Sequence, residues 1–227
     1  MAFEGFTTDT RAFFLELAQH NEKSFFEANR TRFYDSVRDP MRALAAAVSD
    51  AVLDVDDTLD TRPERAVARI RRDTRFSRDK TLYRDHLWAG FRPAGQTASD
   101  CLGLYFEVSA FDVAWGMGFY AAPPQQMARL RAAIAKKPRA FAKLCKDPAL
   151  NAAFTLSGED YKRLPAECDG ASAALLPWLK KKNFYLEHAE AFEPGALDPA
   201  LADRIRHDFR LLKPLYAFLQ NAMTRTV

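Results

Sequence analysis

Residues 102–119 read LGLYFEVSAFDVAWGMGF, and this stretch decides the fold class of the chain. Large apolar side chains occupy every second position from Leu102 to Val108 and again from Val113 to Phe119. Because successive side chains of a strand point to opposite faces, the alternation predicts two strands, each with one better-buried face. Only a few residues around Phe111 separate the two strands, so their connection is predicted to be a hairpin.

The second predicted strand has an unusually bare face, which is formed by Ala114, Gly116 and Gly118. Glycine within a strand packs no side chain, and it permits close approach by a ligand or by another backbone. Glu107 lies on the less apolar face of the first strand and is a candidate carboxylate for a site. A solvated face explains this glutamate equally well.

Helical spacing of apolar residues marks both ends of the chain. The first of three N-terminal helices is predicted to begin after the cap-type residue Thr7 and to end near Asn21, and the third has Pro40 in its first turn. A long helix with a kink at Pro214 is predicted from Leu201 onward. The predicted fold class is therefore α+β, with an antiparallel sheet and its central hairpin packed against N- and C-terminal helices.

Length and composition agree with one globular unit. The chain has 227 residues, 48% of them hydrophobic, which is enough to bury a sizeable core. Neither an internal repeat nor a low-complexity linker interrupts the sequence, so residues 1–227 are predicted to form a single α+β domain. The formal net charge of +3 is low for a protein that coats nucleic acid, so any anion binding is expected to be local.

The cysteines and the hydropathy of the chain indicate the cellular compartment in which the protein is expected to reside. Cys101, Cys145 and Cys168 are far apart and form no C-x-x-C pair, so neither a disulfide framework nor a zinc site is predicted. The first residues do not resemble a signal peptide, and no apolar run is long enough to cross a bilayer. The chain is expected to be soluble and cytoplasmic, without a membrane partner. The sequence indicates neither a cofactor nor an oligomeric state.

The most unusual stretch is residues 67–88, VARIRRDTRFSRDKTLYRDHLW, in which seven Lys and Arg residues meet three Asp residues. Alternation within Ala66–Arg72 predicts a strand of the sheet that packs one side and presents guanidinium groups on the other. A guanidinium is a planar fork of donors that matches the oxygens of phosphate or carboxylate in pairs. The predicted ligand-binding residues are Arg69, Arg71, Arg72, Thr74, Arg75, Ser77, Arg78, Lys80 and Tyr83.

Three interpretations of this stretch stay open. The first is a site for a small anionic ligand that bears phosphate or carboxylate, with His86 or Asp73 as the acid-base candidate if a reaction is catalysed. The second is binding to the nucleic-acid backbone. The third is a structural or partner-binding module in which interleaved aspartates such as Asp79 neutralise the arginines internally. A metal site is not predicted, because the histidines show no ligand spacing.

Several motifs, taken together, resemble one protein family. They are the Arg-rich stretch from Arg69 to Tyr83, FEGF at residues 3–6, NEKSFFEANR at residues 21–30, GMGFY at residues 116–120 and SGEDYKR at residues 157–163. In these motifs the chain is similar to the family known as domain of unknown function 2461, over almost its whole length. It departs from the family pattern at Leu82, where proline is expected, and at Ser24-Phe25, where tryptophan is more usual. The resemblance implies a soluble α+β protein and supplies no reaction, substrate or catalytic residue.

Overall fold

The fold is described from a computed structural model of the chain, in residues 2–75, 78–97, 101–119, 121–165, 168, 170–193 and 197–224. Its central element is a five-stranded antiparallel sheet in the order β1-β2-β3-β5-β4. The strands are β1 (His86–Phe91), β2 (Gly103–Ser109), β3 (Asp112–Gly118), β4 (Thr155–Ser157) and β5 (Tyr185–Ala191). Phe106 of β2 pairs with Trp115 of β3, which confirms the hairpin predicted within residues 102–119.

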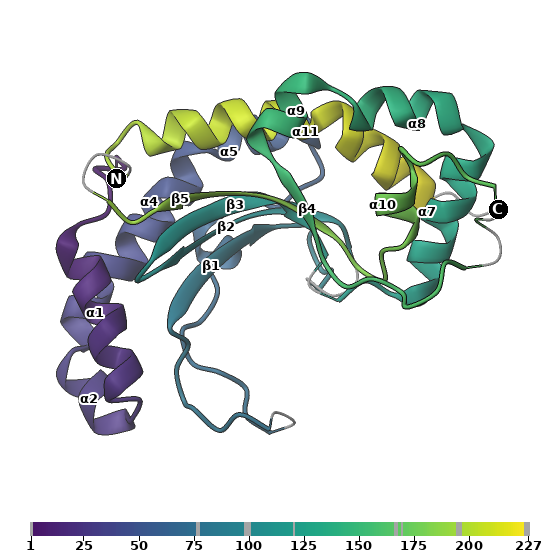
Figure 1. The fold of residues 1–227 in the computed structure, drawn as a ribbon. Coiled ribbons are helices and arrows are strands. Elements are labelled where there is room, and N and C mark those ends of the chain that lie inside the picture. The colour runs from purple at the N-terminus through teal and green to yellow at the C-terminus, as the bar shows by residue number, and fades with distance from the viewer. Residues whose placement is uncertain are drawn as a thin grey trace.

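Helices precede, interrupt and follow the strands. They are α1 (Thr8–Gln19), α2 (Lys23–Ala28), α3 (Arg30–Phe33), the π-helix η1 (Tyr34–Arg38), α4 (Asp39–Ala47), α5 (Ser49–Val55), α6 (Pro63–Ala66), α7 (Pro124–Lys136), α8 (Pro138–Cys145), α9 (Pro148–Ala153), α10 (Leu176–Leu179) and α11 (Leu201–Thr224). Figure 1 shows α5 and α11 lying together above the sheet, while α1 and α2 extend below it at one end. The antiparallel sheet with helices from both ends of the chain confirms the predicted α+β fold.

The helix signals in the sequence act where they were predicted. Thr7 is the N-cap of α1, and its backbone N–H donates to Oγ1 of Thr10 at 3.1 Å, which satisfies a donor that the helix leaves unpaired. Pro40 lies in the first turn of α4, where its missing N–H costs no hydrogen bond. The predicted C-terminal helix is α11, which contains Pro214.

The covered face of the sheet carries the alternate apolar residues of the strands. Phe106 and Trp115 are fully buried, and the ring of Phe91 meets that of Phe209 on α11 with centroids 6.3 Å apart. Full burial of a large apolar side chain contributes about 1.5–3 kcal/mol. The indole Nε1 of Trp115 also donates to Oδ2 of Asp208 on α11 at 2.9 Å. Sheet and helix therefore share both an apolar contact and a buried polar one.

The segment Ala66–Arg72 does not form the predicted strand of the sheet, although Val67 bridges to Ala89 of β1. Ala66 ends α6, and the rest of the segment makes only isolated bridges, at Val67 and Arg71. The edge strand is instead β1, which pairs with β2 along all six of its residues. Only Ala66 and Ile70 of the predicted strand are buried, so little apolar surface fixes the register that a strand needs.

Candidate functional site

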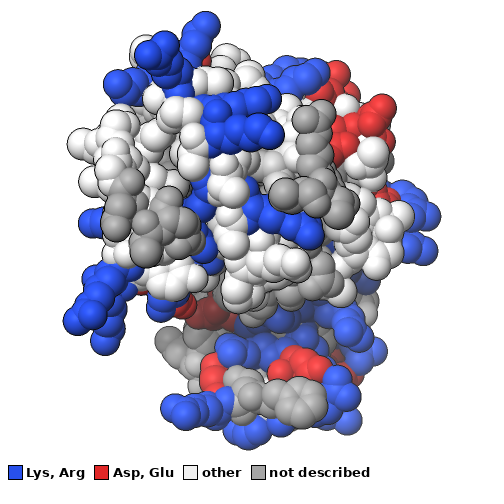
Figure 2. Space-filling view, turned by 90° about the vertical axis from the view of Figure 1, so that its right-hand side faces the viewer, with Lys and Arg blue, Asp and Glu red and all other residues white. Residues whose placement is uncertain are grey.

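The predicted anion-binding residues lie on an arm, which we define as residues 67–85; it hangs below the sheet in Figure 1. Its two sides run antiparallel. The backbone N–H of Arg72 donates to the carbonyl of Leu82 at 2.9 Å, and that of Arg84 donates to the carbonyl of Ile70 at 3.0 Å. The lower, projecting part of the molecule in Figure 2 carries many Lys and Arg side chains and fewer Asp and Glu. The arm therefore presents its cations away from the body of the protein.

One asparagine, Asn21, anchors the arm beside the turn between α1 and α2. Its Oδ1 accepts hydrogen bonds from the backbone N–H groups of Leu82 at 2.8 Å and of Tyr83 at 2.9 Å. Its Nδ2 donates to the carbonyl of Tyr83 at 2.9 Å. The Tyr83 ring stacks on Phe26 of α2 with centroids 4.4 Å apart, and Tyr83 is 4% exposed. Tyr83 thus fixes the arm in place, and its side chain is not presented to a ligand.

Two ion pairs form near the tip of the arm. Arg72 lies 2.8 Å from Asp79, and Arg75 lies 2.6 Å from Asp73. The hydrogen bond from the Arg75 side chain is the main cause that lowers the pKa of Asp73 to about 2. Asp73 is therefore ionised at neutral pH and has no proton to donate, which makes it a poor acid-base group. The third interpretation of the Arg-rich stretch, in which aspartates neutralise the arginines internally, predicts ion pairs of this kind.

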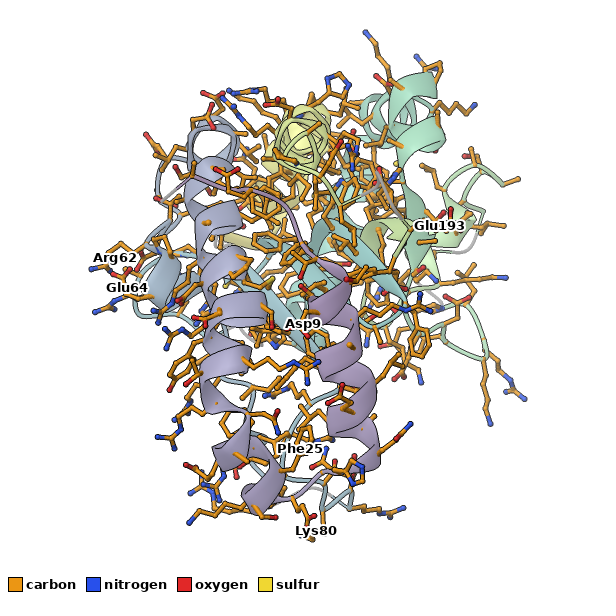
Figure 3. The ribbon with its side chains drawn as sticks, turned by 90° about the vertical axis from the view of Figure 1, so that its left-hand side faces the viewer. Asp9, Phe25, Arg62, Glu64, Lys80 and Glu193 are labelled. Atoms are coloured by element: carbon orange, nitrogen blue, oxygen red, sulfur yellow. The ribbon has the colours of Figure 1, made fainter. Side chains whose placement is uncertain are left out.

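The other predicted residues of the tip differ in their contacts. The Lys80 ammonium donates to the carbonyl of Thr74 at 2.8 Å, and Figure 3 shows Lys80 at the same end of the molecule as Phe25 of α2. Arg78 is exposed, and no carboxylate of the described residues lies within 4.0 Å of it. Ser77 lies outside the described residues. Arg78 thus retains its donors for a further partner.

The base of the arm holds three arginines that form no ion pair with any described residue. Nη1 of Arg84 donates to the backbone carbonyls of Arg69 at 2.9 Å and of Arg71 at 3.4 Å. Arg69 and Arg71 are exposed, and because they are two positions apart in an extended segment they share one side of it. Among the residues that the structure places, no carboxylate oxygen lies within 4.0 Å of these three guanidinium groups. Because the Arg84 side chain contacts the backbone of both other residues, we call Arg69, Arg71 and Arg84 the arginine cluster.

His86 lies where the arm joins β1, between two carboxylates. Its Nδ1 is 2.9 Å from Oδ1 of Asp85, and its Nε2 is 3.8 Å from Oε2 of Glu107 on β2. Burial raises the pKa of the Glu107 carboxyl, and the nearby His86 opposes that rise. Of the two predicted acid-base candidates, His86 is thus the one with carboxylates on both sides of its ring.

A pocket of about 300 Å³ lies next to Glu107, on the face of the sheet that is turned away from the core. Its lining includes Trp88, Arg92, Tyr105, Glu107, Tyr185 and Glu187. The sequence pointed to Glu107 and to the glycine-rich face, and it did not point to Tyr105, Tyr185 or Glu187. The signal for Tyr105 was present in β2, because it alternates with the buried Phe106 and therefore shares the face of Glu107.

A family model described as "Conserved hypothetical protein (DUF2461)" matches residues 9–218 of the chain. The matched range includes the complete arm, all five strands and most of α11. No curated protein matches the chain. Among the described helices, none is both long and apolar enough to span a membrane.

Proposed function

The chain belongs to the family of conserved hypothetical proteins DUF2461, whose description names no reaction, and we propose from the geometry that it binds a small phosphate- or carboxylate-bearing ligand. In this proposal the arginine cluster binds the anionic group, and Thr74, Arg75, Arg78 and Lys80 add donors at the tip. The proposal concerns binding. His86, beside Glu107, is the acid-base candidate for any reaction of the bound ligand.

The observation that carries the proposal is that, in the described part of the chain, no carboxylate oxygen lies within 4.0 Å of the arginine cluster, although Asp73 interacts with Arg69 at longer range. An arginine side chain has five N–H donors. Of the cluster's guanidinium nitrogens, only Nη1 of Arg84 makes a hydrogen bond to the described residues. Guanidinium groups on a fixed backbone form paired, charge-assisted hydrogen bonds with phosphate or carboxylate oxygens, and such bonds are stronger than neutral ones.

The ion pairs of the tip are compatible with this proposal. The side chains of Arg75 and Asp73 are 77% and 58% exposed. Ion pairs in contact with water contribute little to stability, so Arg75 can exchange Asp73 for a ligand carboxylate or phosphate at small cost. Arg72 and Asp79 are also in contact with water, at 30% and 47% exposure, and the same reasoning applies to them.

The anchoring of the arm favours ligand binding, because it lowers the conformational entropy that the arm loses when a ligand binds. The three hydrogen bonds of Asn21 and the stacked ring of Tyr83 fix the backbone before a ligand arrives. A binding segment that is already ordered does not lose this conformational freedom on association, so more of the interaction free energy is retained as affinity.

Thermal-shift measurements at low salt test the proposal with phosphate, pyrophosphate, nucleotides, sugar phosphates, carboxylates and short RNA and DNA. A ligand at about 100 times its Kd adds about 2.7 kcal/mol to the free energy of unfolding, which raises the Tm of a chain of this size by roughly 5–10 °C. We expect such a rise with one class of small anion. The double variant Arg69→Gln/Arg71→Gln is expected to lose that rise, while its unliganded Tm stays within about 2 °C of wild type.

Arg163→Gln is the matched control, because Arg163 is exposed and lies outside the arm. It is expected to keep the response to the ligand. A rise with RNA and DNA that fades as salt is added would replace the proposal with nucleic-acid-backbone binding. A flat panel, combined with a large fall in the unliganded Tm of the double variant, would favour internally paired, structural arginines.

Two further predictions from the sequence are kept as part of this proposal. We propose that residues 1–227 form one domain, and a single cluster of buried side chains that includes Phe3 and Met223 supports this. We also propose a cytoplasmic location, which the wide spacing of the three cysteines supports.

A further inference from the structure

We infer that the pocket on the open face of the sheet binds a small organic ammonium compound. This ligand is opposite in charge to the one proposed for the arm, and the inference goes beyond that proposal because it rests on different residues. Three features carry it: the aromatic rings that line the pocket, the balance of its charged side chains, and a carboxylate to which no described residue donates a hydrogen bond.

Aromatic rings form much of the wall. The Trp88 ring lies over Gly90, since a Cβ built on that glycine would be 2.8 Å from Cζ3 of Trp88. Tyr105 of β2 reaches across β3, and its hydroxyl donates to Oε2 of Glu187 on β5 at 2.7 Å. Tyr185 lines the same pocket. The faces of such rings carry partial negative charge and attract ammonium groups.

The charged side chains of the pocket also favour a cation. Among the described lining residues there are two carboxylates, Glu107 and Glu187, and one guanidinium, that of Arg92. Arg92 already donates through Nε to the carbonyl of Gln96 at 2.9 Å. With both carboxylates ionised, these side chains leave the pocket with one net negative charge. An ammonium ligand neutralises that charge, whereas an anionic ligand increases it.

Glu107 is the lining carboxylate for which the described residues provide no hydrogen-bond donor. Within the described residues its side chain accepts no hydrogen bond, because Nε2 of His86 lies at 3.8 Å, beyond hydrogen-bonding distance. The Glu107 side chain is 37% exposed, and burial raises its pKa. A partly buried carboxylate gains most from a partner that supplies both positive charge and N–H donors. A primary ammonium group supplies both.

The size of the pocket sets the size of the ligand. A volume of about 300 Å³ is at the lower end of the range for pockets that hold small molecules. The ligand is therefore a compact molecule whose ammonium group contacts Glu107 and whose carbon atoms contact Trp88 and the two tyrosines. Simple alkylammonium compounds reproduce these features and serve as probes.

The three tryptophans provide the readout, because their indole N–H signals are separate in a heteronuclear NMR spectrum. Trp88 lines the pocket, whereas Trp115 and Trp178 are buried outside its lining and serve as internal references. The probes are butylammonium, which supplies both charge and N–H donors, with butanol as its neutral partner, and choline, which supplies the charge without an N–H donor, with its neutral isostere, in which carbon replaces nitrogen. We expect a saturable shift of the Trp88 signal with the ammonium probes. Each neutral partner is expected to bind about tenfold more weakly or worse.

Glu107→Gln tests the role of the carboxylate, because it keeps the shape and removes the charge. It is expected to weaken ammonium binding about tenfold or more, with the Trp115 and Trp178 signals unchanged as evidence of an intact fold. Glu193→Gln is the control, since Glu193 is exposed and is absent from the pocket lining. Equal binding of neutral and charged probes, unchanged binding to Glu107→Gln, or a Trp88 signal that no probe shifts would overturn the inference. The Arg69→Gln/Arg71→Gln variant is expected to bind the ammonium probes as wild type does, which separates this test from that of the arm.

Discussion

Gly116→Ala is expected to lower the free energy of unfolding by about 3 kcal/mol, because the added methyl group has no space. A Cβ at this position would lie 1.8 Å from the carbonyl oxygen of Leu186 and 2.9 Å from its carbonyl carbon. Both atoms belong to the backbone of β5, which pairs with β3 along seven residues. The two strands must therefore separate locally, and hydrogen bonds of the ladder weaken. The Tm is expected to fall by roughly 6–12 °C.

Gly90→Ala is the matched control for this variant, because Gly90 is also a strand glycine with a short contact. There the nearest atom to the added Cβ is Cζ3 of the Trp88 side chain, at 2.8 Å. A ring edge can move by rotation of its side chain, whereas a paired backbone cannot, so a loss below about 1 kcal/mol is expected. Equal losses in the two variants, measured by urea unfolding, would contradict the account of Gly116.

Trp115→Phe is expected to cost about 3 kcal/mol, chiefly because it leaves a carboxylate in the core without its donor. Trp115 is fully buried and Asp208 is 9% exposed, and they are joined by the 2.9 Å hydrogen bond from Nε1 to Oδ2. The phenyl ring also fills less space than the indole, which adds a smaller packing loss. The indole moreover stacks on His188, with ring centroids 4.4 Å apart, so part of this contact is lost as well.

A double-mutant cycle separates the polar part of this loss from the packing part. Asp208→Leu alone is expected to be destabilising, because it leaves the Trp115 N–H unpaired. The double variant Trp115→Phe/Asp208→Leu contains neither the donor nor the acceptor, so no buried polar group is left unpaired. Its loss of stability is therefore expected to be about 1–2 kcal/mol smaller than the sum of the two single losses. Additive losses in urea unfolding would show that the hydrogen bond contributes nothing beyond packing.

The hairpin of β2 and β3 could be predicted from the sequence because its signals are local. Alternate positions such as Phe106 and Trp115 face the core, and the connection between the strands is short, so period and spacing suffice. The starts of α1 and α4 could be predicted for the same reason, since Thr7 and Pro40 act on the turn next to them.

Local patterns could not predict β5. They also could not show that the segment Ala66–Arg72 forms no strand. Of the seven residues of β5, only Leu186 is buried, so the strand has no regular apolar period. Its place between β3 and β4 depends on pairing with β3, a segment about seventy residues earlier in the sequence. The Ala66–Arg72 segment shows the opposite case, because it has the alternating pattern of a strand and still does not form one. Only two of its side chains are buried, which is too little apolar contact to hold it in the sheet as a strand.

The sequence predicted that the candidate site is rich in arginine, but it did not predict which of its arginines form ion pairs. The density of arginines identified the arm, but no pattern in the sequence explains why Arg72 pairs with Asp79 while no described carboxylate lies within 4.0 Å of Arg69 or Arg71. That difference depends on how the two sides of the arm pair, with Arg72 opposite Leu82, and local sequence patterns do not specify this pairing. The role of Asn21 as the anchor of the arm could not be predicted either, because Asn21 lies about sixty positions before the residues to which it is hydrogen-bonded.

The most direct test of the central claim, that the arginine cluster binds an anionic group, is an NMR titration of the arginine side-chain Nε–H signals with inorganic phosphate at low salt. We expect saturable shifts for Arg69, Arg71 and Arg84. Arg32 and Arg210 are the internal references, because their Nε–H groups already donate to Asp9 and Asp54 and are not expected to shift to the same extent. Shifts of equal size in all five arginines, or a cluster that does not respond to phosphate or to a small carboxylate, would contradict the claim.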